Sequence, residues 1–168
     1  MKLKSITYGA VSLVIIIISF NLFRGSINIF NSIVVPLTLY IYFKMFNLLE
    51  SISIVITLLI IIMLFFIQQL VFIVLYIIIS LILVLYSKIN LNKYIKIIIL
   101  SLGLALGFYL SIYLTDLFLG TNILNVLLTI VNYNNFRLLI LFCIEGLFVG
   151  IVLNFTIKIL NKKLYFLN

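Results

Sequence analysis

The sequence predicts an all-α integral membrane protein, a compact bundle of six transmembrane helices with both termini in the cytoplasm. Three observations predict this class. Of the 168 residues, 67% are apolar and only 8% are charged, whereas soluble domains carry about 25% charged residues. Long apolar runs such as 14–18 and 56–67 lack the alternation of a membrane β-strand. The basic residues flank these runs and form no dense patch.

The first three expected spans are residues 6–23, 29–43 and 52–67. The first run follows Lys2 and Lys4 and is long for the apolar part of a signal peptide. No small-residue cleavage site follows it, so we expect it to be retained as a span. The second run contains Pro36, which removes a backbone donor and predicts a kink of the kind that membrane helices tolerate.

The other expected spans are residues 70–86, 97–118 and 138–160. A single helix over 52–86 would be about 52 Å long, too long for a hydrocarbon core of about 30 Å, so we place a turn at Gln68-Gln69. Residues 119–136 contain one apolar stretch that is too short to cross, and we expect it to be interfacial or re-entrant. Together these elements form one transmembrane domain, residues 1–168.

The charges orient the predicted spans. Arg24 and Arg137 fall at the outer ends, and the other nine basic residues fall at the inner ends: Lys2, Lys4, Lys44, Lys88, Lys93, Lys96, Lys158, Lys162 and Lys163. Such a bias is typical of cytoplasmic ends. The tyrosines near the inner boundary, Tyr40, Tyr42, Tyr86 and Tyr94, match an aromatic belt. We therefore expect a multi-pass protein of a bacterial plasma membrane.

The composition argues against most catalytic chemistry. Histidine is absent, the chain has three acidic residues, and Cys143 is its single cysteine. No intrachain disulfide, metal-ligand spacing or nucleophile–base pair follows from such a set. We expect no enzyme activity, no cofactor and no metal site. Membrane topology explains the basic residues, so we expect no nucleic-acid partner.

Three small-residue faces are able to bring helix backbones close together. They contain Gly103 with Gly107, Gly146 with Gly150, and Ser5 with Gly9 and Ala10. Packing within the chain and docking of a partner both use such faces. We expect intrachain packing for the glycine pairs. The face at Ser5 lies in the first span, where partner docking is a second hypothesis.

Glu145 is the most informative single residue. It lies about 12 Å along the helix from Arg137, inside an apolar run. An ionisable group there costs at least about 2.5–3.5 kcal/mol, so function is the default hypothesis. The carboxyl is suited to bind a polar or cationic solute group or a proton. The alternative is a hydrogen bond to a neighbouring helix.

Polar residues gather at the predicted outer ends: Asn21, Arg24, Asn28, Asn31, Gln68, Asp116 and Arg137. They are either wet helix ends or the mouth of an outward-facing pocket floored by Glu145. On the second interpretation, the candidate solute-binding residues are Glu145, Arg24, Asn21, Asn31, Asp116 and Arg137.

Three short segments carry a resemblance to known proteins: Lys4–Ala10, Val35–Tyr40, and Glu145–Gly150 with the later Lys162 and Lys163. With them, the chain resembles the substrate-binding S components of energy-coupling-factor importers and the related YybS-like membrane proteins. The resemblance implies a subunit that captures a vitamin or similar micronutrient on the outer side. It also implies two kinds of partner, a membrane coupling subunit and ABC-type ATPases.

A second resemblance rests on Leu114–Gly120, which contains Asp116. This segment is similar to one in the rod-shape protein MreD, and it implies a small multi-span scaffold of the cell-wall machinery. A third hypothesis is an accessory subunit of another membrane complex.

Overall fold

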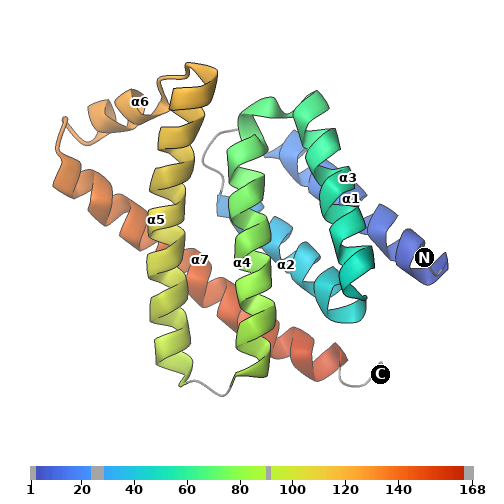
Figure 1. Cartoon of the computed structure of the whole chain (residues 1–168). Coiled ribbons are helices and arrows are strands. Elements are labelled where there is room, and N and C mark those ends of the chain that lie inside the picture. The colour runs from blue at the N-terminus through green and yellow to red at the C-terminus, as the bar shows by residue number, and fades with distance from the viewer. Residues whose placement is uncertain (1–2, 24–28, 90–91, 165–168) are drawn as a thin grey trace. The chain divides into compact units, whose positions relative to one another are not determined.

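The computed structural model describes residues 3–23, 29–89 and 92–164, without the side chains of residues 93, 163 and 164. Every regular element in these ranges is helical (Figure 1). The elements are α1 (Leu3–Leu22), α2 (Ile29–Met45), α3 (Leu48–Phe65), the 3₁₀ helix η1 (Ile67–Gln69), α4 (Leu70–Lys88), α5 (Lys93–Leu119), α6 (Ile123–Ile130) and α7 (Asn135–Leu164).

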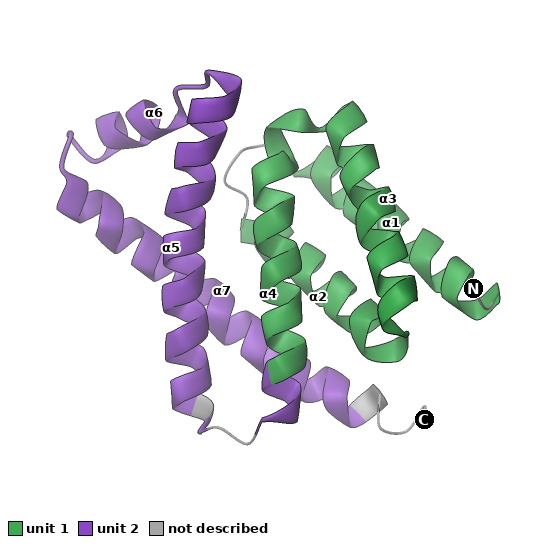
Figure 2. Cartoon of the chain, viewed as in Figure 1, with its two compact units in different colours: residues 1–85 green, residues 86–168 purple. Residues whose placement is uncertain are grey.

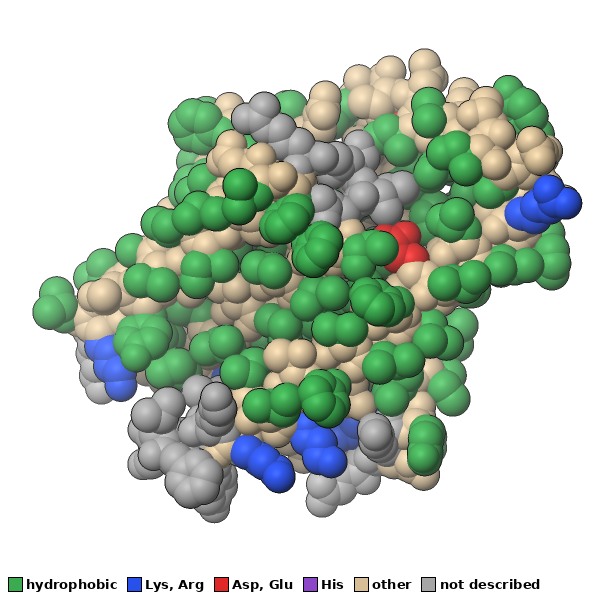
Figure 3. Space-filling view, turned by 180° about the vertical axis from the view of Figure 1, so that it is seen from behind, with side chains coloured by type: hydrophobic (Ala, Val, Ile, Leu, Met, Phe, Trp, Pro, Cys, Tyr) green, Lys and Arg blue, Asp and Glu red, His purple; other side chains and the backbone are tan. Residues whose placement is uncertain are grey.

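Five helical segments in the described part of the chain are long and apolar enough to cross a membrane. They are Leu3–Leu22, Leu48–Phe65, Ile67–Lys88, Tyr94–Leu119 and Asn135–Lys162. The 17 residues of α2 span about 25 Å at 1.5 Å per residue, a little less than the hydrocarbon core. Hydrophobic side chains are spread over the face shown in Figure 3, and few charged side chains lie among them. The all-helical prediction is confirmed, and these features fit a multi-pass protein that contacts a lipid bilayer.

The turn predicted at Gln68-Gln69 is confirmed. Helix α3 ends at Phe65, and Phe66 leaves helical geometry with φ −141° and ψ 46° before η1 begins. The short apolar stretch near residue 123 forms α6, whose eight residues span about 12 Å. This length confirms that α6 is too short to cross. The 3₁₀ helix η1 thus separates α3 from α4, although no glycine or proline lies at this turn.

The chain divides into two compact units, residues 1–85 and 86–168 (Figure 2). In the first unit, α1 presents a stripe of mostly small buried residues at spacings of three and four: Ser5, Gly9, Ser12, Ile16 and Ser19. The Ser5 and Tyr42 hydroxyls lie 3.0 Å apart at one end of the α1–α2 pair. A β-carbon on Gly9 would meet Tyr42 at 3.5 Å and Ile54 at 3.7 Å. Intrachain packing therefore occupies this face, whereas Ala10 is exposed.

In the second unit, α5 packs against α7 through small residues on both helices. A β-carbon on Gly146 would stand 2.5 Å from the Ser101 carbonyl oxygen and 3.0 Å from the Ala105 nitrogen. A β-carbon on Gly150 would stand 2.6 Å from the Ser101 hydroxyl oxygen. These contacts confirm that Gly146 and Gly150 pack within the chain, because only residues without side-chain bulk allow so close an approach.

The packing role expected for Gly103 is wrong. Gly103 is exposed, and a β-carbon there would meet no described atom within 4 Å. Its partner in the motif, Gly107, is half-buried. The small residues of α5 that face α7 are instead Ser101 and Ala105, which share the four-residue spacing but are offset by two positions. A rotation of about 200° around a helix separates residues two positions apart, so Gly103 lies on the other side.

Candidate solute-binding site

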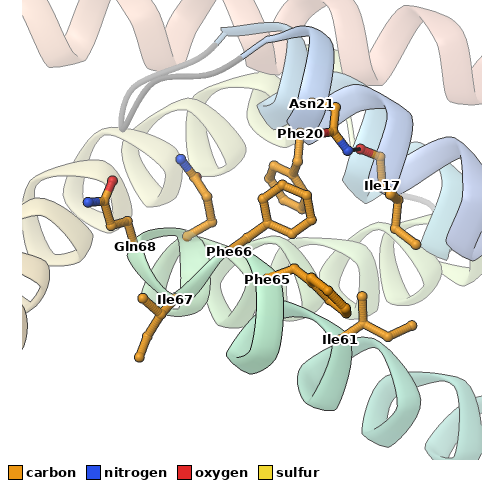
Figure 4. Close-up of a pocket in the computed structure, with 9 residues that line it drawn as sticks. Ile17, Phe20, Asn21, Ile61, Phe65, Phe66, Ile67 and Gln68 are labelled. Atoms are coloured by element: carbon orange, nitrogen blue, oxygen red, sulfur yellow. Dashed lines mark hydrogen bonds between the residues drawn. The ribbon is translucent and has the colours of Figure 1, made fainter.

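A pocket of about 800 Å³ lies in the first unit, where α1 and α3 end (Figure 4). It is lined by Ile17, Phe20 and Asn21 from α1 and by Ile61, Phe65, Phe66, Ile67, Gln68 and Gln69 from α3 and the turn after it. Its volume is within the range of about 300–1,000 Å³ that small-molecule sites occupy. The pocket thus brings Asn21 together with Gln68, two of the polar residues that the sequence places at the outer ends.

Phenylalanines dominate one part of the pocket. The rings of Phe20 and Phe66 are 5.8 Å apart between centroids and tilted by 37°, and Figure 4 shows them side by side. Phe65 is 74% exposed. The non-helical backbone at Phe66 brings this ring beside Phe20 at the end of α1. Aromatic surface in such a pocket favours apolar and ring-containing molecules.

Two amide side chains supply hydrogen-bonding groups at the same pocket. The Asn21 side-chain nitrogen donates to the Ile17 carbonyl oxygen at 3.0 Å, which leaves Asn21 Oδ1 without a partner among the described residues. The Gln68 side chain is exposed and makes no hydrogen bond within the described part of the chain. Both amides therefore have hydrogen-bonding capacity to offer a solute.

Asn31, a predicted pocket residue, instead joins two helices. It is fully buried. The Ser19 hydroxyl donates to Asn31 Oδ1 at 2.5 Å, and Asn31 Nδ2 donates to the Phe23 carbonyl oxygen at 3.1 Å. These bonds tie the end of α1 to the start of α2. Asn31 does not line the pocket, because its polar atoms are directed into the interface between the two helices.

Asp116, another predicted pocket residue, caps a helix. Gly120 ends α5 with φ 64°, and the chain then turns back past Asp116. Asp116 Oδ1 accepts from the Thr121 hydroxyl at 2.5 Å and the Ile123 backbone N–H at 2.9 Å, while Oδ2 accepts from the Leu124 N–H at 2.8 Å. The carboxylate thereby satisfies backbone donors at the start of α6. This capping contradicts a role for Asp116 as a free polar group at a pocket mouth.

Arg137, a further predicted pocket residue, is not among the described residues that line the pocket. Arg137 is exposed near the start of α7, where its backbone N–H donates to Asn134 Oδ1 at 3.1 Å. Arg24 lies outside the described residues. Of the five predicted residues that the structure describes, Asn21 is the one that lines the pocket.

Glu145 is buried in the second unit, with 8% of its surface exposed. Its Oε1 atom has no hydrogen-bond partner among the described residues, and the same is true of the Ser101 hydroxyl. Phe142, three residues earlier, and Val149, four residues later, are buried on the same helix. Glu145 therefore remains a polar group with unused hydrogen-bonding capacity in an apolar setting.

The described residues contain no cluster of three or more histidine, cysteine or acidic side chains that would hold a metal ion. The pocket phenylalanines Phe20, Phe65 and Phe66 are not among the residues predicted from the sequence. The sequence signal for Phe65 and Phe66 is their adjacency, one residue before Gln68-Gln69, and Phe20 has none. Comparison of the chain with protein-family models, curated proteins and solved structures gives no match.

Proposed function

We propose that the chain is a plasma-membrane protein of six spans, with both termini cytoplasmic, that binds a small solute as a subunit of an importer. The observation that carries this proposal is the pocket at the ends of α1 and α3. It combines an apolar wall with Asn21 and Gln68, whose amides have hydrogen-bonding atoms without a partner among the described residues. A predominantly apolar pocket with a few polar groups is typical of small-molecule sites.

The positions of the lysines support the orientation, unit by unit. In the first unit α1 and α2 are antiparallel, because Ser5 contacts Tyr42 at one end and Ser19 contacts Asn31 at the other. Lys4, one residue before Ser5, and Lys44, two residues after Tyr42, consequently lie at the same end of this pair. A concentration of lysine at one end favours the cytoplasmic side for that end.

The second unit also has its described lysines at one end of its helices. Gly150 packs on Ser101, whereas Phe142 meets Tyr109 with ring centroids 6.2 Å apart, so α5 and α7 are antiparallel. The end of α5 that carries Lys96 is therefore the end of α7 that carries Lys158 and Lys162. Arg137 lies at the other end of α7.

This orientation places the pocket on the outer side, where an importer captures its solute. Helices α1 and α3 both begin at the proposed cytoplasmic side, and the pocket is formed by their last residues. Within the second unit, Glu145 Oε1 has no hydrogen-bond partner among the described residues. This supports a functional role for Glu145 in that unit, because a buried carboxyl with unused hydrogen-bonding capacity in a membrane span is costly unless it serves a function.

Co-purification tests the importer proposal. Purification of the tagged full-length chain in mild detergent from its own host should recover a membrane coupling subunit and ABC-type ATPases. A preparation free of such ATPases, obtained under conditions that preserve other membrane complexes, would contradict the proposal. Reporter fusions at both termini, after residue 89 and after residue 121 test the topology, for which only the fusion after residue 121 should report an outer location.

A further inference from the structure

The pocket of the first unit has a chemistry that restricts its ligand. Resting on the proposed function, we propose that its solute is an uncharged molecule with a ring and a polar edge that both donates and accepts hydrogen bonds. Three properties of the described lining residues carry this inference: the aromatic surface, the absence of charged side chains among them, and the hydrogen-bonding atoms of Asn21 and Gln68 that have no described partner.

The ring follows from the phenylalanines. Phe20 and Phe66 already pack against each other, and Figure 4 shows that they form one aromatic surface within the pocket. Phe65 makes no ring contact with another described residue and is 74% exposed. Its ring is therefore available to pack edge-to-face or offset against a ring of the solute, which are the geometries that aromatic pairs prefer.

None of the nine described lining residues is charged, because six are apolar and three are amides (Ile17, Phe20, Asn21, Ile61, Phe65, Phe66, Ile67, Gln68 and Gln69). A charged solute group that enters such a pocket loses hydration and gains no opposite charge from these side chains. The penalty for burying an unpaired charge far exceeds that for burying a hydrogen-bonded neutral group. The lining therefore discriminates against carboxylates and ammonium groups.

The polar edge follows from the amides. Asn21 offers an acceptor, because its nitrogen is already bonded to the Ile17 carbonyl oxygen and its Oδ1 is not. Gln68 offers both a donor and an acceptor. A solute amide, lactam or comparable edge supplies the complementary donor and acceptor. An acyl chain would leave both amides unpaired, so a lipid tail fits this lining less well.

A set of related probes tests the inference. The full chain is reconstituted in nanodiscs of phosphatidylcholine, and binding is measured for 2-naphthamide, 2-naphthoate, 2-naphthylmethylammonium and the ringless octanamide. The chain contains no tryptophan, so naphthyl fluorescence can be followed without tryptophan background, and octanamide is assayed by competition. Specific binding is the signal from nanodiscs with the wild-type chain minus the signal from nanodiscs with the Phe65→Ala or Gln68→Leu variant. Both residues are exposed, so these variants should fold. Phe118→Ala, at an exposed site of the second unit, is the matched control.

We expect 2-naphthamide to bind at least about tenfold more tightly than the three other probes, and the two pocket variants, but not Phe118→Ala, to weaken it. Gln68→Glu should shift the preference toward the ammonium probe, because it adds a negative charge to the lining. Pocket-dependent binding that favours a charged probe or octanamide would overturn the ligand class while leaving solute binding intact. Equal signals from wild type and both pocket variants for every probe would overturn solute binding at this pocket.

Discussion

Gly146 approaches Ser101 so closely that a β-carbon at position 146 would stand 2.5 Å from the Ser101 carbonyl oxygen. The obstacle is backbone on α5, which cannot rotate away as a side chain does. The absence of a side chain at position 146 therefore allows the short distance between the backbones of α5 and α7. Gly150 differs in one respect, because its closest obstacle is the Ser101 hydroxyl oxygen at 2.6 Å, the movable end of a side chain.

This difference predicts an order of destabilisation for alanine substitutions in the second unit. Gly146→Ala should lower the free energy of unfolding by about 1–3 kcal/mol, the usual cost of overpacking, and Gly150→Ala by less. Gly103→Ala is the matched control, because its β-carbon enters open space and alanine favours helix by up to about 1 kcal/mol. Unfolding by SDS titration measures all three. Equal losses at 103 and 146 would contradict the packing described.

The Ser101 hydroxyl gives this prediction a second test. Ser101→Ala removes the oxygen that a β-carbon at position 150 would meet, so Ser101→Ala/Gly150→Ala should recover much of the stability lost in Gly150→Ala. Ser101→Ala should not rescue Gly146→Ala, because the obstacle at position 146 is the backbone carbonyl of residue 101, which the substitution leaves in place. A double-mutant cycle of unfolding free energies separates the two cases.

Because Asp116 caps α6, its removal should loosen α6 locally. Asp116→Ala removes the acceptor for the Thr121 hydroxyl and for two backbone N–H groups, and lost caps cost about 0.5–2 kcal/mol. Hydrogen exchange in α6 should accelerate by about tenfold, since 1.4 kcal/mol corresponds to that factor. Arg137→Ala is the control and should leave α6 unchanged. Faster exchange throughout α5 and α7 would indicate a global rather than a capping role.

The bond between Ser19 and Asn31 predicts non-additive stability effects. Ser19→Ala leaves the buried Asn31 Oδ1 without its partner and should cost about 1–3 kcal/mol. Ser19→Ala/Asn31→Leu removes both polar groups and should cost less than the sum of the single substitutions. Thermal unfolding in detergent measures the set, with the exposed Asn21→Ala as control. Strictly additive losses would show that the two residues act independently.

How far the sequence predicts this protein depends on the kind of feature. Helix bounds follow from apolar length and charge, so spans such as α3 and α7 were expected within a few residues. The small-residue spacing also predicts the Gly146–Gly150 contact. The same spacing at Gly103 gave the wrong answer, because which face of α5 meets α7 depends on all the side chains of both helices.

The candidate site was less predictable. Asn31 and Asp116 look like free polar residues until their partners are known, and those partners lie 12 residues away in one case and on the backbone of the following helix in the other. Phe20, Phe65 and Phe66 give almost no signal in a chain that is 67% apolar. What makes them a site is the turn at Phe66, which is a property of the folded backbone.

Glu145 predicts a trade-off between stability and function. Its Oε1 atom has no described partner, and an unsatisfied buried polar group costs about 1–3 kcal/mol. Glu145→Met removes this cost at similar length, so it should raise the free energy of unfolding by about that amount. The same substitution should lower solute uptake by the assembled importer, whereas Glu50→Met, in the first turn of α3, should leave that uptake intact. A large loss of stability in Glu145→Met would instead assign the carboxyl to a hydrogen bond that holds the helices together.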